Sequence, residues 1–86
     1  MTNINFKRVK KVELFQKKLR EKALKNGVKM LSPETVYLSP DTKFGKDIVI
    51  EPFVVIGQNV KIGNNVLIKS FTHIEGAKIE NKVIIG

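Results

Sequence analysis

The sequence predicts a mainly β protein, in which an N-terminal α-helix precedes a short parallel β-helix built from six-residue repeats. Over residues 6–26, apolar residues recur at steps of three and four, the spacing of one helix face. From residue 38 the spacing changes to six, which is the period of neither a helix nor a plain strand. The change of spacing after Gly27 divides the chain into a basic helical arm, residues 1–27, and a β-helix, residues 28–86.

The expected helix carries an apolar stripe and has a recognisable end. The stripe consists of Phe6, Val9, Val12, Leu14, Phe15, Leu19, Ala23 and Leu24. No Pro or Gly interrupts residues 6–26, and Gly27 follows, where a left-handed C-cap favours a residue without Cβ. We therefore expect the helix to end just before Gly27.

The positive charge of the chain is concentrated in this arm. The whole chain has 16 Lys and Arg against 8 Asp and Glu, a net charge of +8. Residues 1–27 contain nine basic and two acidic residues, so they carry +7 and the rest of the chain carries +1. One interpretation is an arm that binds nucleic acid or an anionic surface; the other is a helix with a solvated basic face and an apolar stripe docked on a partner. No recognition motif or interleaved aromatic residue accompanies the charge, so we expect neither a nucleic-acid nor a membrane partner.

Two ladders of side chains define the six-residue repeat. The apolar ladder is Leu38, Phe44, Ile50, Ile56, Ile62, Ile68 and Ile74. Two residues before each of these lies a β-branched residue: Val36, Thr42, Ile48, Val54, Val60, Val66 and Thr72. After Ile74 the phase slips by one residue and resumes at Ile79 and Ile85. A period of six fits a short strand followed by a tight corner, such as Gly63-Asn64-Asn65, whose residue types tolerate positive φ. An antiparallel meander would need a longer period of about 8–12 residues.

Residues eighteen apart become vertical neighbours if three repeats close one coil. Ile50 then lies on Ile68, and the other inward positions likewise meet apolar residues or Thr. Phe53 falls on Phe71, outside both ladders, so the two rings are expected to stack on the outer surface. We therefore expect Phe53 and Phe71 to form a partner-binding surface.

These residues resemble a known family. The runs Ile56-Gly57-Gln58-Asn59-Val60-Lys61 and Ile62-Gly63-Asn64-Asn65-Val66-Leu67 are similar to the hexapeptide repeat of left-handed β-helix acyltransferases. More specifically, Ser32-Pro33-Glu34-Thr35-Val36-Tyr37 and Ser70-Phe71-Thr72-His73-Ile74-Glu75-Gly76-Ala77 resemble the bacterial bifunctional N-acetylglucosamine-1-phosphate uridyltransferase/glucosamine-1-phosphate N-acetyltransferases. The resemblance runs from about Phe15 to Gly86. It implies a left-handed coil, which the periodicity alone does not establish.

The resemblance also implies a transferase of UDP-N-acetylglucosamine synthesis, which uses acetyl-CoA and a divalent metal and assembles as a trimer. The similar segment corresponds to the end of the helix that joins the two domains of these enzymes and to the first coils of their β-helix. The Gly-rich nucleotide loop of the uridyl domain, and the catalytic His and coenzyme-binding residues of later coils, have no counterpart in this sequence. We therefore assign no catalytic, cofactor-binding or metal-binding residue and expect no cofactor.

Three side chains are the candidates for catalysis. His73 is the only His, with Glu75 two residues away, but strand alternation directs it outward and its surroundings do not resemble the catalytic segment of the family. Glu51 and Glu75 are not eighteen apart, and Glu51 has Lys69 as its expected neighbour. We expect all three to be surface residues. The chain has no Cys, which excludes a thiolate nucleophile and a Cys-based zinc site.

Three functions are compatible with these features. The first is a truncated relative of the bifunctional transferases, the product of a decayed gene or one half of a split enzyme, not catalytic alone. The second is a non-enzymatic scaffold that trimerises or binds a related hexapeptide-repeat chain through Phe53 and Phe71. The third is a binder of nucleic acid or anionic membrane through the basic arm. The alternative to association is a monomer whose helix folds back over the two phenylalanines or over the open end of the coil.

The cytoplasm is the expected location. No run approaches the roughly 18 apolar residues of a membrane span, and Met1 to Phe6 do not form the apolar region of a secretory signal.

Overall fold

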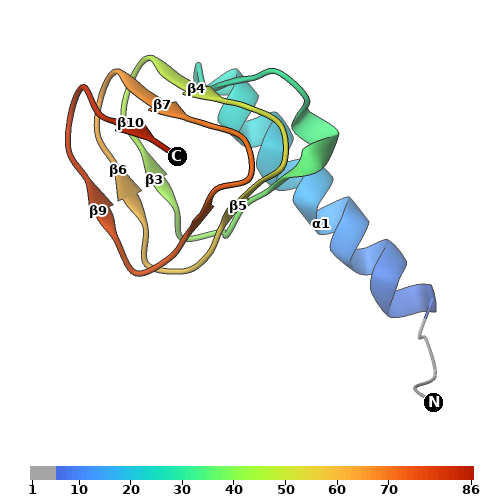
Figure 1. Ribbon diagram of the computed structural model, residues 1–86. Coiled ribbons are helices and arrows are strands. Elements are labelled where there is room, and N and C mark those ends of the chain that lie inside the picture. The colour runs from blue at the N-terminus through green and yellow to red at the C-terminus, as the bar shows by residue number, and fades with distance from the viewer. Residues whose placement is uncertain (1–5) are drawn as a thin grey trace.

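A computed structural model, which describes residues 6–86, shows one helix followed by a β-helix of about three coils (Figure 1). Helix α1 spans Phe6–Lys25, so the helix expected over residues 6–26 is confirmed to within one residue. Residues 1–5 of the expected arm, and the place of the Phe6 side chain in the stripe, lie outside the residues whose structure is described. Within residues 6–86, no helix combines the length and apolarity that crossing a membrane requires.

The end of α1 follows from Gly27. Its φ of +92° is the left-handed conformation expected at this position. The Val28 N–H donates to the carbonyl oxygen of Ala23 and the Gly27 N–H to that of Leu24, each at 3.1 Å. This is the Schellman pattern, and burial of both Ala23 and Val28 supplies the apolar contact that accompanies it.

Ten short strands and one 3₁₀ turn form the solenoid. Their bounds are β1 Lys29–Met30, the 3₁₀ turn Pro33–Thr35, β2 Val36–Tyr37, β3 Lys43–Phe44, β4 Ile48–Ile50, β5 Val54–Ile56, β6 Lys61–Ile62, β7 Val66–Ile68, β8 His73–Ile74, β9 Lys78–Ile79 and β10 Ile84–Ile85. They make three parallel sheets: sheet A is β1-β4-β7-β10, sheet B is β2-β5-β8 and sheet C is β3-β6-β9. The first strand pairs with β4 from Lys29 onward, so the coil begins before residue 36, where the regular ladders start.

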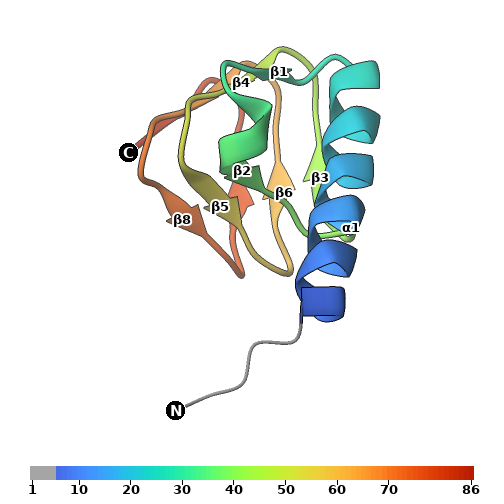
Figure 2. The ribbon, with the colours of Figure 1, turned by 90° about the vertical axis from the view of Figure 1, so that its right-hand side faces the viewer.

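The coil is left-handed, as the resemblance implies. Figure 1 views the solenoid nearly along its axis, and Figure 2 shows that the C-terminal coil lies on the side nearest the viewer of Figure 1, with α1 on the far side. From β7 through β9 to β10 the chain runs clockwise while it approaches that viewer. A coil that turns clockwise as it approaches is left-handed.

The two ladders form the core. Along the apolar ladder, Ile50, Ile56, Ile62 and Ile68 are at most 2% exposed. The register places Ile50 beside Ile68 and Phe44 beside Ile62, which confirms the spacing of eighteen. In the second ladder the Ile and Val residues are buried, and only Thr42 and Thr72 are half-buried.

The phase slip is a shortening of one corner. Ile62 pairs with Ile79, and Ile68 with Ile85, each seventeen residues apart. The missing residue lies between β8 and β9, where Gly76 takes a φ of +59°. The shorter corner keeps the ladder in register, so Ile79 and Ile85 still pack against the core.

The corners use left-handed backbone conformations, but not at Gly45, Gly57 and Gly63, which follow the apolar ladder. The non-glycine residues with positive φ are Asp47, Phe53, Asn59, Asn65, Phe71 and Lys82. In the corner Gly63-Asn64-Asn65, therefore, Asn65 has the positive φ. Gly63 is required for space instead: a Cβ there would meet the Asn81 side-chain oxygen and lie 3.0 Å from the Asn81 backbone nitrogen.

Helix α1 covers the N-terminal end of the solenoid (Figure 2). Leu19 and Ala23 pack against the core cluster. Gln16 and Arg20 form hydrogen bonds to the backbone of β2 and of the residue that follows it. The side-chain amide of Gln16 donates to the Leu38 carbonyl and accepts from the Leu38 N–H, both at 2.8 Å. The Arg20 Nε donates to the Val36 carbonyl at 2.7 Å. These bonds satisfy an edge strand that would otherwise present unpaired backbone groups.

Candidate interaction surface

The three outer faces of the solenoid differ in chemistry. Sheet A presents mainly apolar side chains outward, namely Val49, Leu67 and Ile84 beside Lys29. Sheet B presents Tyr37, Val55 and His73. Sheet C presents Lys43, Lys61 and Lys78. The corner between the two less charged faces is therefore the natural place to look for an interface.

Phe53 and Phe71 occupy that corner, between sheets A and B. Their ring centroids are 5.4 Å apart with an interplanar angle of 10°, so the predicted stack is confirmed. Phe53 is 55% exposed and Phe71 is 83% exposed. We call these two residues the aromatic corner. Such a pair, mostly open to solvent, is a large apolar feature on a small body.

Both phenylalanines are held in left-handed backbone conformations. Their φ values are 61° and 63°. Left-handed geometry costs about 1–2 kcal/mol for a residue with a Cβ, and it is a true outlier for a bulky side chain. Equivalent positions in the other corners hold residues that tolerate it better, such as Asn59, Asn65 and Gly76. An aromatic side chain therefore occupies this turn at a conformational cost.

Hydrogen bonds between coils fix the aromatic corner. The Phe53 N–H donates to Thr35 Oγ1 at 3.0 Å, and the Phe71 N–H donates to the Phe53 carbonyl at 2.9 Å. The Thr35 hydroxyl in turn donates to the Ser32 carbonyl at 2.7 Å. The corner is thus a rigid ladder that directs both rings outward.

The first coil adds polar groups beside this corner. The guanidinium of Arg20 lies 5.3 Å from the centre of the Tyr37 ring, a cation–π contact. The Ser32 hydroxyl donates to Glu34 Oε1 at 2.6 Å and lowers the pKa of this exposed carboxyl below its ordinary value. Arg20, Tyr37 and Glu34 line a groove between α1 and the first coil, together with Gln16 and Glu21.

The apolar stripe of α1 is only partly covered by the solenoid. Leu19 and Ala23 pack on the solenoid, but Val12, Leu14 and Phe15 are 51%, 60% and 48% exposed. Val9 and Leu24 are also exposed. The N-terminal turns of the helix project beyond the coil, where they have no solenoid surface to pack on (Figures 1 and 2). The helix folds over the N-terminal end of the coil and leaves the aromatic corner uncovered.

The three candidate catalytic side chains do not form a site. His73 is exposed on the outer face of β8, and Glu75 is exposed near it. Glu51 is half-buried, and its Oε1 accepts a hydrogen bond from the Ser70 backbone N–H at 3.0 Å, next to its expected neighbour Lys69. Among the described residues, no three His, Cys, Asp or Glu side chains are grouped so that they could hold a metal ion.

Comparison with known proteins assigns the solenoid to a family. The sequence model described as the GMPPB C-terminal domain matches residues 32–86. The chain belongs to this family. The matched residues start at the 3₁₀ turn and include every strand from β2 to β10.

Individual relatives of this GMPPB C-terminal domain match more of the chain, including part of α1. The bifunctional protein GlmU of Zymomonas mobilis is 49% identical over 73 residues, 85% of this chain and 16% of the relative. The GlmU of Rhodopseudomonas palustris is 54% identical over 69 residues, 80% of this chain and 15% of the relative. That of Bradyrhizobium diazoefficiens is 56% identical over 61 residues, 71% and 14% of the respective chains. These matches confirm the resemblance to the bifunctional hexapeptide-repeat enzymes, and this chain spans about one sixth of their length.

Three features of the surface were not predicted from the sequence. Neither Gln16 nor Arg20 was expected to contact the β-helix, although both form hydrogen bonds to the first coil. The signal available was their place on the same helix face as Leu19 and Ala23, three or four residues away. The lysines of sheet C could have been found by applying the spacing of eighteen to outward positions, with the later slip of one residue.

Proposed function

We propose that this chain is an assembly module related to the bifunctional uridyl- and acetyltransferases, which forms a homotrimer in the cytoplasm through the aromatic corner. In this proposal residues 1–27 are a helical arm and residues 28–86 are the β-helix. The observation that carries the proposal is the stacked, exposed and conformationally strained pair Phe53 and Phe71. The trimer, rather than another oligomer, rests on the family resemblance.

The energetics favour a covered aromatic corner. In a monomer, the mutual stacking of the two rings, worth about 0.5–1.5 kcal/mol, and the hydrogen bonds between coils offset the cost of the left-handed geometry, but the rings stay exposed to water. Covering the rings adds about 25 cal/mol for each Å² of apolar surface removed from water. The outward residues Val55 of sheet B and Ile84 of sheet A, 42% and 68% exposed, lie on the two faces that meet at this corner and enlarge the surface available to a partner.

The first prediction is that the double substitution Phe53→Asn and Phe71→Asn dissociates the assembly. Asn accepts the left-handed conformation readily, so the corner should fold while losing its apolar surface. Sedimentation equilibrium of the natural chain should show a concentration-dependent trimer, and the double variant should be a monomer at the same concentrations. Phe15→Ser is the control, since it removes an exposed ring from α1 and leaves the corner intact.

Two results would count against this interface. One is a natural chain that stays monomeric at every concentration tested. The other is a trimer that survives the double substitution. Circular dichroism of each variant would verify that the β-helix remains folded.

The second prediction concerns catalysis. We expect the isolated chain to transfer neither an acetyl group to glucosamine 1-phosphate nor a uridyl group to N-acetylglucosamine 1-phosphate. The physical reason is that His73 is exposed on the outer face of a single strand, whereas a general base needs a substrate proton within hydrogen-bond reach in a formed site. Product formation from acetyl-CoA or UTP would be followed directly. Acetylation by the pure chain that disappears in His73→Ala would contradict the prediction.

A further inference from the structure

Sheet C carries a column of three lysines on its outer face. Lys43 on β3 pairs in register with Lys61 on β6, and Lys61 pairs with Lys78 on β9. All three side chains are exposed. Adjacent strands lie about 4.8 Å apart, so the attachment points of the outer two lysines are about 10 Å apart. We call Lys43, Lys61 and Lys78 the lysine column.

Like charges at directly opposed positions of neighbouring strands destabilise a sheet. Folding does not require lysine at these outward positions, because the inward residues Phe44, Ile62 and Ile79 provide the packing of sheet C. Each of these three sheet positions nevertheless places a lysine against another lysine. This arrangement concentrates positive charge on one face at some cost in stability.

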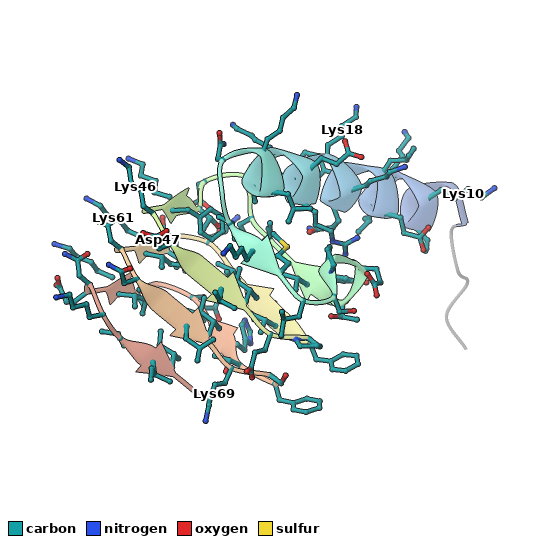
Figure 3. The ribbon with its side chains drawn as sticks, turned by 90° about the horizontal axis from the view of Figure 1, so that it is seen from above. Lys10, Lys18, Lys46, Asp47, Lys61 and Lys69 are labelled. Atoms are coloured by element: carbon teal, nitrogen blue, oxygen red, sulfur yellow. The ribbon has the colours of Figure 1, made fainter. Side chains whose placement is uncertain are left out.

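The surroundings of the column define what it could bind. Lys43, Lys61 and Lys78 line a shallow hollow together with Asn59 and Gly76, small or polar residues that let a ligand approach. Asp41, also at the rim, has one carboxylate oxygen engaged by the Asn59 N–H at 2.9 Å. At the other ends of the strands, the acidic residues Asp47 and Glu80 are accompanied by the basic residues Lys46 and Lys82. Figure 3 shows Lys46 and Lys61 extending from the same side of the solenoid, away from Lys69 and from the helix.

We propose that the lysine column binds a linear phosphate chain. Lysine ammonium groups act as point charges for phosphate, and three of them in a line match successive charges of one extended anion. No aromatic side chain points outward from sheet C, so the stacking platform of a single-stranded nucleic-acid site is lacking on this face. The outward residues also lack the apolar side chains that insert into a membrane interface.

Inorganic tripolyphosphate is the probe that tests this site, with orthophosphate as the short comparison. Isothermal titration calorimetry of the full chain at low salt should show that tripolyphosphate binds at least tenfold more tightly than orthophosphate. Its affinity should fall as salt is added, because bound counterions are released. Lys61→Gln, which removes the central charge, should weaken tripolyphosphate binding about fivefold, the equivalent of ~1 kcal/mol.

Lys18→Gln and Lys69→Gln are the matched controls. Each removes one exposed positive charge, as Lys61→Gln does, but Lys18 lies on the helix and Lys69 lies in the corner between sheets A and B (Figure 3). Both should retain the affinity of the natural chain. Thermal unfolding without ligand should show that Lys61→Gln is at least as stable as the natural chain, because a like-charge contact is removed.

Three outcomes would overturn the proposal. One is an equal loss of affinity in all three single-charge variants, which would show that only net charge matters. Another is undiminished binding by Lys61→Gln. The third is a single-stranded oligonucleotide that binds more tightly than tripolyphosphate at the same salt and depends on Lys61, which would assign the face to nucleic acid.

Discussion

Ile62→Ala is expected to lower the free energy of unfolding by about 2–4 kcal/mol. Ile62 is 2% exposed and lies in the middle coil, between Phe44 and Ile79 of the neighbouring coils. Truncation removes buried methyl groups and leaves a cavity that stacked strands cannot readily close, because their backbone ladders fix the spacing between coils. On a domain of this size such a loss lowers the melting temperature by about 10 °C or more.

The matched control is the preceding residue. Lys61→Ala alters the same strand, but its side chain lies on the outer face, so its unfolding free energy should change by less than about 0.5 kcal/mol. Urea denaturation of both variants at one protein concentration would measure the difference. Similar losses for the two substitutions would contradict the assignment of the inward ladder.

The β-helix could be predicted closely because its geometry is repetitive. A spacing of six fixes which residues face inward, and a spacing of eighteen fixes which residues meet between coils. One rule therefore anticipates both the burial of Ile56 and Ile68 and the stacking of Phe53 on Phe71. The slip after Ile74 was also visible, since a shortened corner shifts every later residue by one place.

The docking of α1 could not be predicted in the same way. Apolar spacing identified a stripe, but it did not reveal that, among the stripe residues whose side chains the structure describes, Leu19 and Ala23 are the ones that pack with the core of the coil. That outcome depends on the length of the solenoid face, beyond which the N-terminal turns project, and on polar contacts. The bonds of Gln16 and Arg20 join residues 22 and 16 apart in the sequence, a separation that no local pattern encodes.

Gln16→Ala is expected to destabilise the chain by about 2–3 kcal/mol, although the residue is neither apolar nor fully buried. Its amide supplies both hydrogen-bond partners of Leu38, a residue only 5% exposed at the edge of the first coil. Removing the amide leaves one N–H and one carbonyl without these partners, and an unsatisfied buried polar group costs about 1–3 kcal/mol. Lys17→Ala, an exposed neighbour on α1, is the control and should be nearly neutral in urea denaturation.

Gln16→Glu separates the hydrogen bonds from the space that the side chain fills. At pH 7 the carboxylate would still accept from the Leu38 N–H, but it cannot donate to the Leu38 carbonyl and would repel that oxygen. Protonation restores the missing donor, so folding would raise the pKa of the introduced carboxyl above its unfolded value. The folded state then binds the proton more readily than the unfolded state, and the variant recovers stability as the pH falls toward 4. The stability gap between variant and natural chain should therefore narrow from pH 7 to pH 4; a gap independent of pH would show that Gln16 acts by packing and not by pairing with the edge strand.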